Sequence, residues 1–529
     1  MKAILSGLFV LGLSITSLVV ASTDTFGADL AVQTLTEYFD LLASGNVESA
    51  RYLWTEQSLE RAERFGIEYI GIPLKPDCAS PIVRNLEVMR YHLERPAKLV
   101  TDLDDPNYKQ LLYSNVVEGE LVEYNYYTYS DGQYWWLCYP QDYYCRDWPI
   151  RETRYFRIHV DPTAERYLNP VALQAADEFI ERIADSLRLS KDRMKTLQDE
   201  KIEYFLCGKD STVQLISGRL VKGVFDMPSN DLISAFFPHY HELVHLLVNI
   251  KLQRLPLYTQ PMLREGVAVY YGGRWGKTPS SLMGLGAFLY REDIVYLDSL
   301  LAMPLFETHS GADIAYPVAG LFAAYLMDRV GRDGYFDLYR TLSGDYETVN
   351  SQTVAQVKQV LVEATKSGDW ETFRAGFGEY IDDVMENKSV IRPGSLTKGK
   401  ELAKGEHYLV RADKDWLGFE FSFGDGQEAT GNLMFGHDGR LVGISSILYG
   451  EQYGVDTVLD GYRYGVRFDR NEVGLYDYAT SHLMAKYIWG IAPSDDYFDA
   501  DNNRVTVMLR KDLLGKQWPS NNDVKFLAQ

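Results

Sequence analysis

The pentapeptide HELVH, residues 241–245, combines residue types that can bind a metal ion and activate water. A helix turns about 100° per residue, so His241 and His245 lie one turn apart on nearly the same face, where both imidazoles can reach one ion. Glu242 lies beside the pair and can reach a water on that ion, which is the position that a general base requires. A satisfied pair of core histidines and a structural zinc site are the alternative interpretations of this spacing.

A candidate for a third ligand, Glu265, lies 20 positions after His245 in the segment PMLREGVAVYYGG. Pro261 favours the start of a helix there, and the residues in between are numerous enough to turn the chain back. Two histidines and one carboxylate leave a fourth position open for water, whereas a purely structural zinc site usually fills all four positions with Cys or His. The sequence therefore predicts one Zn²⁺ per chain, bound by His241, His245 and Glu265.

The segments HELVH and REGVAVYY resemble the two signature elements of the gluzincin metallopeptidases, the class that contains the thermolysin and aminopeptidase N families. The resemblance covers roughly residues 150–385 and is specific around these two motifs. It implies a small sheet packed on a mainly helical subdomain, zinc ligation by the three residues named above, and activation of the water by Glu242. The sequence has no GxMEN-type segment, with which aminopeptidases of this class hold a free amino terminus, so endopeptidase action or another amide substrate stays open.

Three weaker candidates accompany the motifs. Tyr316 precedes Pro317, which disfavours α conformation at Tyr316 and predicts that it lies at the start of a helix ending near Gly331. The resemblance gives such a tyrosine the role of stabilising the oxyanion, and a packing tyrosine is the alternative. Residues 216–226, ISGRLVKGVFD, are typical of a strand. The resemblance implies that it is an edge strand above the cleft, and an internal sheet strand is the alternative. His239 is either a pocket donor or a plain neighbour.

The chain of 529 residues is too long for one hydrophobic core and predicts a multidomain α+β protein. Residues 29–65 show helical apolar spacing with a break at 44–46, and residues 110–160 alternate like antiparallel strands. A Pro-, Gly- and Lys-rich stretch follows residue 388, and Gly-punctuated alternating runs follow it. The predicted parts are a signal peptide (1–21), an α+β N-terminal domain (22–150), the gluzincin-like domain (151–388), a linker (389–404) and a β-rich C-terminal domain (405–529).

The first 21 residues have Lys2, an apolar run and small residues before Ser22, which together predict a cleaved secretory signal. An uncleaved membrane anchor is the alternative, since the run of about 17 residues is near the lower limit for spanning a bilayer. We expect a secreted, periplasmic or cell-surface protein without stable membrane insertion after signal cleavage. In that compartment Cys138 and Cys145 could close a short loop by a disulfide, and Cys78 and Cys207 could pair or stay free.

The formal charge of -21, from 74 acidic and 53 basic residues, argues against nucleic-acid binding. The sequence thus predicts an exported zinc metallohydrolase, and specifically a peptidase, which acts on a peptide or protein with Glu242 and Tyr316 as catalytic residues. The alternative is an exported binding or scaffold protein whose zinc site is structural or vestigial. In both cases the outer domains are candidates for contact with a glycan or a protein partner, and the aromatic run at 123–145 is either a stacking platform or core packing.

Overall fold

The computed structural model describes residues 24–95, 99–117, 119–165, 168, 170–275, 279–308 and 311–387. Beyond these it describes residues 399–404, 408–412, 416–422, 431–436, 441–445, 462–468, 473–477, 482–486, 498–499 and 504–510. The predicted signal segment, residues 1–21, lies outside them. The described residues form helices and several small sheets, which confirms the α+β prediction at this level. None of the helices in these ranges is long and apolar enough to cross a membrane.

The chain divides into two compact units, and both are discontinuous in sequence. Unit 1 consists of Met1–Thr55 and Ser80–Tyr139, and unit 2 consists of Glu56–Ala79 and Pro140–Gln529. The sequence assigns all of residues 22–150 to one domain, whereas the segment Glu56–Ala79 is grouped here with the unit that holds HELVH. The predicted boundaries at residues 150, 388 and 405 stay predictions.

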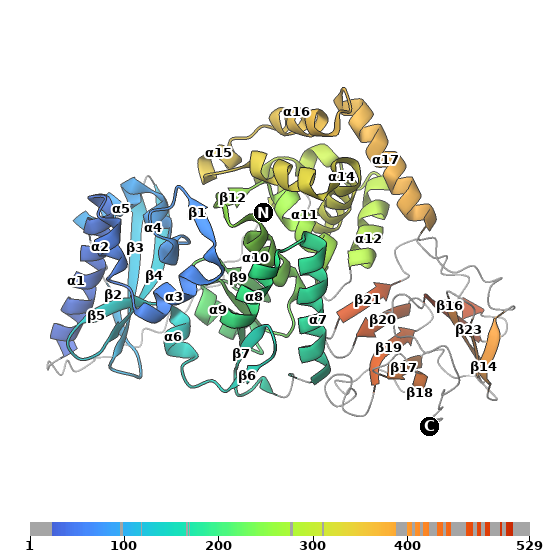
Figure 1. The fold of residues 1–529 in the computed structure, drawn as a ribbon, viewed down its shortest axis with the longest axis horizontal. Coiled ribbons are helices and arrows are strands. Elements are labelled where there is room, and N and C mark those ends of the chain that lie inside the picture. Colours follow the sequence, from blue (N-terminus) through green and yellow to red (C-terminus); the bar gives the residue numbers. More distant parts are fainter. Residues whose placement is uncertain are drawn as a thin grey trace, which may run out of the picture. The chain divides into compact units, whose positions relative to one another are not determined.

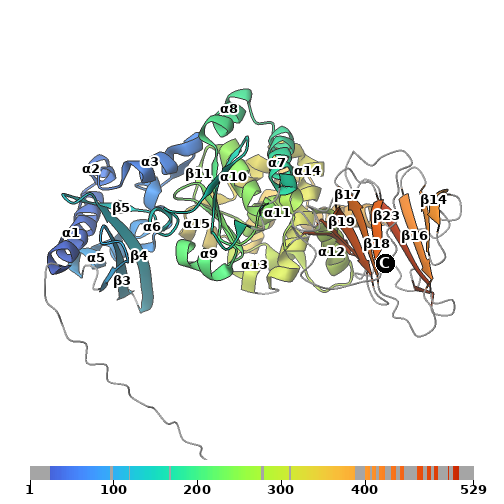
Figure 2. The ribbon, with the colours of Figure 1, turned by 90° about the horizontal axis from the view of Figure 1, so that it is seen from below.

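Unit 1 packs helices on a four-stranded antiparallel sheet of order β2-β3-β4-β5. Its strands are β2 (Leu99–Asp102), β3 (Tyr108–Val117), β4 (Glu120–Ser130) and β5 (Trp135–Cys138). Its helices are α1 (Asp24–Ala43), α2 (Val47–Arg51), α4 (Pro81–Arg84) and α5 (Leu86–Glu94), and the predicted break at 44–46 separates the first two. Helices α1 and α5 pack against each other and against the sheet (Figure 2). Their shared core encloses His92, which is fully buried between the rings of Phe39 and Tyr113.

Unit 2 contains a five-stranded mixed sheet of order β6-β7-β8-β10-β9. Its strands are β6 (Ile150–Glu152), β7 (Phe156–Val160), β8 (Ile202–Leu206), β9 (Gly223–Asp226) and β10 (Asp231–Ser234). The helices near them in sequence are α3 (Glu56–Glu63), α6 (Pro140–Tyr144), α7 (Pro170–Leu187), α8 (Lys191–Glu200) and α9 (Asp210–Ser217). Strands β7, β8 and β10 run parallel, and β9 pairs antiparallel to β10 at one edge.

The predicted strand over residues 216–226 is correct only from Gly223 onward. Helix α9 occupies Asp210–Ser217, because Val213 and Ile216 recur at helical spacing and both are buried. Gly218 ends this helix with a φ of 73°, a conformation that glycine adopts without strain. The strand that remains, β9, is short and lies at the sheet edge.

Residues 240–387 are mainly helical (Figure 1). The helices are α10 (Tyr240–Leu252), α11 (Pro261–Gly272), α12 (Pro279–Arg291), α13 (Met303–Thr308), α14 (Ala312–Thr341), α15 (Tyr346–Asn350), α16 (Val354–Thr365) and α17 (Trp370–Asn387). Short strands β11 (Arg254–Pro256), β12 (Tyr258–Thr259) and β13 (Ser343–Gly344) lie between them. Strand β1 (Glu68–Ile70) pairs in parallel with β11. The excursion Glu56–Ala79 is thereby built into unit 2.

Helices α10, α11 and α14 are in contact in series, α10 with α11 and α11 with α14. Gly266 makes the second contact possible, since a Cβ atom at this position would lie 2.5 Å from the carbonyl oxygen of Ala319 in α14. The close packing of α11 on α14 therefore requires a glycine after Glu265. Any larger residue would push α11, and with it Glu265, away from α14.

The described residues after 399 are almost entirely strands, as the alternation of the sequence predicts. They form two antiparallel five-stranded sheets, of order β14-β15-β16-β23-β22 and β18-β17-β19-β20-β21. The strands are β14 (Lys400–Lys404), β15 (Tyr408–Ala412), β16 (Trp416–Ser422), β17 (Gly431–Gly436), β18 (Leu441–Ser445), β19 (Tyr462–Phe468), β20 (Val473–Asp477), β21 (His482–Lys486), β22 (Phe498–Asp499) and β23 (Arg504–Arg510).

Candidate metal centre

Helix α10 presents the HELVH side chains from an almost wholly buried scaffold. The apolar residues of the motif and of the turn after it are fully buried: Leu243, Val244, Leu246 and Leu247. Glu242, His245 and Asn249 follow one another at spacings of three and four residues, so they share one face of the helix, and all three line the same pocket. His241, one residue before this face, is 2% exposed.

Helix α11 brings Glu265 to the two histidines. It starts at Pro261, as predicted, after β11 and β12 have turned the chain back. The Oε2 atom of Glu265 lies 3.1 Å from Nε2 of His241 and 3.5 Å from Nε2 of His245. One candidate ligand atom from each of the three residues falls within 4.8 Å of the other two.

These distances fit a tetrahedral ion. Ligand atoms bonded to zinc at about 2.0 to 2.2 Å in tetrahedral geometry lie roughly 3.3 Å from one another. The two carboxylate–imidazole distances, 3.1 and 3.5 Å, bracket this value. The donor set of two imidazole nitrogens and one carboxylate oxygen is also a common one for zinc. The three side chains are therefore suited to hold Zn²⁺ with one position left for a further ligand.

The protonation states agree with metal binding as well. The Nδ1 atom of His241 lies 2.9 Å from the carbonyl oxygen of Gly273, which can only accept, so Nδ1 carries the proton and Nε2 presents a lone pair. Burial lowers the pKa of His241, which keeps the ring neutral. Burial raises the pKa of Glu265, but the Arg264 guanidinium and the His245 imidazole outweigh it and hold this pKa well below its usual range. A neutral imidazole and an ionised carboxylate are the forms that bind metal.

Two arginines flank the ligands. Nε of Arg264 donates to Oε1 of Glu265 at 2.8 Å, which leaves Oε2 to face the histidines. Nη1 of Arg274 lies 2.9 Å from Nε2 of His241 and 3.7 Å from Oε2 of Glu265. The guanidinium of Arg274 also lies 3.6 Å from the centre of the Tyr316 ring, a cation–π contact.

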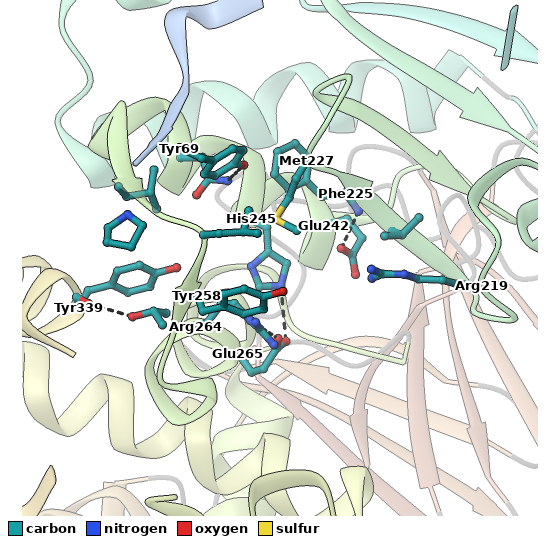
Figure 3. A pocket seen from close by; sticks show the side chains of 16 residues that line it. Tyr69, Arg219, Phe225, Met227, Glu242, His245, Tyr258, Arg264, Glu265 and Tyr339 are labelled. Atoms are coloured by element: carbon teal, nitrogen blue, oxygen red, sulfur yellow. Dashed lines mark hydrogen bonds and ion pairs between the residues drawn. The ribbon is translucent and has the colours of Figure 1, made fainter. Parts of the chain in front are cut away.

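A pocket of about 180 Å³ opens beside the ligands (Figure 3). Its walls include apolar residues of β9 and β11 and the polar side chains of Tyr69, Tyr258 and Tyr339. The Tyr69 hydroxyl, contributed by β1, accepts a hydrogen bond of 3.1 Å from the Asn249 amide. The pocket thus joins residues from α10, α11 and the segment Glu56–Ala79.

Glu242 is held at the pocket wall by the edge strand. Its Oε2 accepts a hydrogen bond of 2.9 Å from the backbone N–H of Phe225 in β9. Burial raises the pKa of Glu242, but the imidazoles of His245, His239 and His241 outweigh this and bring the pKa below its ordinary value. Glu242 is thus a carboxylate that lies beside the ligands without belonging to the convergent set.

Tyr316 lies elsewhere than the sequence predicts. Helix α14 begins at Ala312, so Tyr316 lies within the helix and not at its start, and Pro317 is accommodated inside it. Close packing outweighs the local preference of a residue before proline: the carbonyl oxygen of Pro317 lies 2.4 Å from where a Cβ on Gly286 of α12 would be. The predicted end near Gly331 corresponds to a break with a φ of 74°. The Tyr316 ring centre is 6.0 Å from that of His241, but Tyr316 is not among the residues that line the pocket.

His239 precedes α10 and is stacked on Phe236, with ring centres 4.7 Å apart. A Cβ at Gly223 would lie 2.4 Å from the His239 ring, which therefore packs directly against β9. It does not line the pocket.

Cys145 and Cys207 are free thiols in one buried cluster. The sequence allows Cys145 to form a disulfide with Cys138, and the free thiol of Cys145 contradicts this expectation.

Sequence reasoning missed several residues of the site. Arg264 is the direct neighbour of Glu265, and Asn249 lies one turn after His245, so helical spacing could have indicated both. Arg274 follows the second motif after two glycines, with no signal beyond proximity. Tyr69 and Arg219 carry no local signal, because their positions depend on how distant segments pack.

Comparison of the chain with protein-family models, with curated proteins and with solved structures returned no match of any of the three kinds. What the chain offers is the arrangement itself: two imidazoles and a carboxylate that converge, a second carboxylate beside them, and a pocket open to all of them except the buried His241.

Proposed function

We propose that this chain is an exported zinc-dependent metallohydrolase of the gluzincin type, a peptidase that cleaves a peptide or related amide bond. The observation that carries the proposal is the convergence of His241, His245 and Glu265 at distances suited to zinc, beside a pocket that also contains Glu242. A buried cluster of lone-pair donors next to an open pocket is the arrangement that a catalytic metal requires.

Zinc bound there would polarise the substrate carbonyl and lower the pKa of a bound water. The chain's own residues supply the remaining roles. Glu242 takes the proton of the attacking water and then delivers it to the nitrogen of the leaving amine. The N–H of Phe225 keeps the Glu242 carboxylate at the pocket wall, at 2.9 Å. The oxyanion role of Tyr316 stays a prediction, and Arg274, which contacts both Tyr316 and His241, is a second candidate cation for that role.

The edge strand supports a peptide as the substrate. Strand β9 is paired on one side with β10, and an extended peptide can lie along its other side. Because Glu242 already accepts the N–H of Phe225, such a peptide would pair with the other backbone groups of this edge. Val224 and Phe225 of this strand line the pocket, together with Leu255 and Leu257. Apolar walls with a few polar groups suit the side chains of a peptide next to the bond that is cleaved.

The substitution Glu242→Gln tests the proposal. The variant should still bind about one zinc per chain by elemental analysis, and hydrolysis of a broad peptide library should fall by about 10²- to 10⁴-fold, the usual contribution of general acid–base catalysis. Glu371→Gln is a matched control, since it makes the same exchange at an exposed glutamate of α17 that does not line the pocket, and it should leave hydrolysis unchanged. Unchanged turnover in Glu242→Gln would refute the mechanism.

An exported binding or scaffold protein with a structural or vestigial zinc site is the second candidate. The observation that favours it is Arg274, whose guanidinium lies close to His241 and Glu265 and could fill the side of the cluster where a fourth ligand would bind. Zinc bound at about one per chain without cleavage of any library peptide would support the scaffold. Zinc with cleavage would support the enzyme.

A further inference from the structure

Among the described residues, the acidic and basic side chains that line the pocket are Glu242, Glu265, Arg264 and Arg219. Glu265 is paired with Arg264 at 2.8 Å, and Glu242 accepts the N–H of Phe225 at 2.9 Å. The guanidinium of Arg219 differs from the other three, because it makes no hydrogen bond or ion pair with any residue that the structure describes. Burial raises the pKa of Asp226 to about 6, and the guanidinium of Arg219 opposes this rise from beyond ion-pair distance. Arg219 is an exposed residue at the pocket wall, so its guanidinium is accessible to a ligand.

The backbone that carries Arg219 is nevertheless held in place. Its N–H donates to Oγ of Ser217 at 3.2 Å, and its carbonyl accepts the N–H of Val221 at 3.0 Å. Lys222 closes the loop through an ion pair of 2.6 Å with Asp210 at the start of α9. The side chain is therefore presented by a loop with defined ends, which lowers the entropy lost when a ligand binds.

Glu242 lies between His245 and Arg219 in the close view of the pocket, and Arg219 points toward it (Figure 3). No ion pair within 4.0 Å joins the two among the described residues, so Arg219 is not committed to holding the general base. A substrate group bound to Arg219 would thus lie on the Glu242 side of the metal ligands, close to the reacting bond.

The charge of the pocket contrasts with that of the chain. The chain has a formal charge of -21, and yet two arginines balance two glutamates at this pocket. A bound divalent cation would leave these lining groups positive, and the Asp226 carboxylate, which interacts with Arg219, would offset part of that charge. An anionic group is then attracted to a place where a planar guanidinium can bind it through two parallel hydrogen bonds, the geometry that carboxylates favour.

We propose that the pocket selects peptides that carry a carboxylate next to the cleaved bond, and that Arg219 binds this carboxylate. The proposal rests on the proposed peptidase function and adds the chemical class of its substrate. The carboxylate has two sources, an acidic side chain or the free carboxyl terminus of the peptide, and the experiment separates them.

Two sets of matched peptides provide the test. In one set Glu is exchanged for Gln at each position around the cleaved bond, and in the other the terminal carboxylate is exchanged for an amide. For each pair the ratio of kcat/KM values measures the preference for the carboxylate. Arg219 is exposed, so solvent screens its interaction with a carboxylate. We expect a ratio of about 2 to 10 in the wild type for one of the two sets, and a ratio near 1 in Arg219→Gln.

Two further variants make the result specific. Arg219→Lys keeps the charge but not the planar fork, so it should retain part of the preference. Arg188→Gln removes the same charge from an exposed arginine that does not line the pocket, and it should leave both the ratio and the activity unchanged. Equal losses for both members of each pair in Arg219→Gln, or no preference in the wild type, would overturn the proposal.

A binding measurement separates failure of this proposal from failure of the proposed function. The dissociation constants of the same peptide pairs for the zinc-loaded Glu242→Gln protein are measured by calorimetry, with and without Arg219→Gln. If the wild type cleaves no peptide, the peptidase proposal fails, while a carboxylate preference in binding that depends on Arg219 would still support the role of this residue. No dependence on Arg219 in either readout would contradict it.

Discussion

Unit 2 contains two buried groups of charged and metal-binding side chains, and they differ in whether their members pair with one another. The first, the charge cluster, consists of Arg61, Arg64, Asp142, Glu203 and Asp231, all buried or nearly so. Each cation in it meets an anion: Arg61 pairs with Asp142 at 2.8 Å, and Arg64 pairs with Asp231. In these pairs a guanidinium donor faces a carboxylate acceptor. This is the arrangement expected where a buried charge is compensated by an opposite charge of the protein itself.

The metal centre brings together groups of the same kind. Nε2 of His241 and Oε2 of Glu265 each present a lone pair, and they face each other at 3.1 Å. Two facing lone pairs are unfavourable unless a proton or a cation lies near both. The guanidinium of Arg274 lies 2.9 Å from the first atom and 3.7 Å from the second, and a zinc ion would bind both directly. A buried cluster whose members complement one another thus points to stability, and one whose members need a further partner points to binding.

The largest effect should come from the charge cluster. Asp231→Asn leaves Arg64 buried with its nearest carboxylate partner removed, and we expect the free energy of unfolding of unit 2 to fall by about 3 to 5 kcal/mol. Hydrogen exchange of peptides from β8 and β10 measures this loss. Asp333→Asn breaks an exposed pair with Arg188 and should change stability by less than about 1 kcal/mol. Zinc affinity should not change in either variant.

Glu265→Gln should show the reverse pattern. Four ligands together give structural zinc sites about 10 to 16 kcal/mol, so one ligand accounts for about 3 to 4 kcal/mol and its loss weakens zinc binding about 10²- to 10³-fold. Competition with a chromophoric chelator measures the affinity. Gln keeps an acceptor oxygen for Arg264 but loses the charge of the pair, so the zinc-free variant should be less stable than the zinc-free wild type by less than Asp231→Asn costs. A large loss of stability without a change in zinc affinity would break the distinction between the two clusters.

His92 in unit 1 sharpens the comparison, because it is buried with no hydrogen-bond partner for either ring nitrogen among the described residues. Burial lowers its pKa from 6.5 to about 4. Below pH 6.5 the imidazole is protonated in the unfolded chain but stays neutral in the folded unit. The free energy of unfolding therefore decreases as the pH is lowered from about 6.5 to about 4, by about 3 kcal/mol in total. Hydrogen exchange of α5 and β3 across this range is the measurement, and His92→Phe should remove this component of the pH dependence. An identical pH profile in the variant would refute the assignment.

The smallest effect concerns Arg264. Its hydrogen bond to Oε1 orients the Glu265 carboxylate, so Arg264→Met should weaken zinc binding by about 10- to 100-fold, the usual effect of removing a partner of a metal ligand. Arg264→Lys should restore part of the affinity, since it keeps a donor near the carboxylate. Equal zinc affinities in the Met variant and the wild type would show that Glu265 needs no such support.

The parts of the site that depend on local periodicity could be predicted from the sequence. The i, i+4 spacing of His241 and His245 and the start of α11 at Pro261 follow from the geometry of one helix. The convergence of Glu265 with the histidines required only one turn of the chain between two helices. The α+β character likewise follows from apolar patterns.

What depends on long-range packing could not be predicted. Tyr316 was expected at a helix start from the proline that follows it, but contacts of α14 with α11 and α12 decide its conformation. The sequence predicts that Arg219 belongs to a strand over residues 216–226, but it lies in the loop between α9 and β9. The role of zinc, the peptidase activity and the export of the chain stay predictions.

The parallel pairing of β1 with β11 has a consequence for how the chain is made. The two strands are separated by roughly 180 residues in sequence. At a synthesis rate of about 5 to 20 residues per second, β1 leaves the ribosome at least about 10 seconds before its partner exists. During that interval its exposed edge is open to pairing with other chains. The segment Glu56–Ala79, which carries β1, also interrupts the sequence of unit 1. Unit 1 is therefore fully synthesised before β11, the pairing partner of β1, exists.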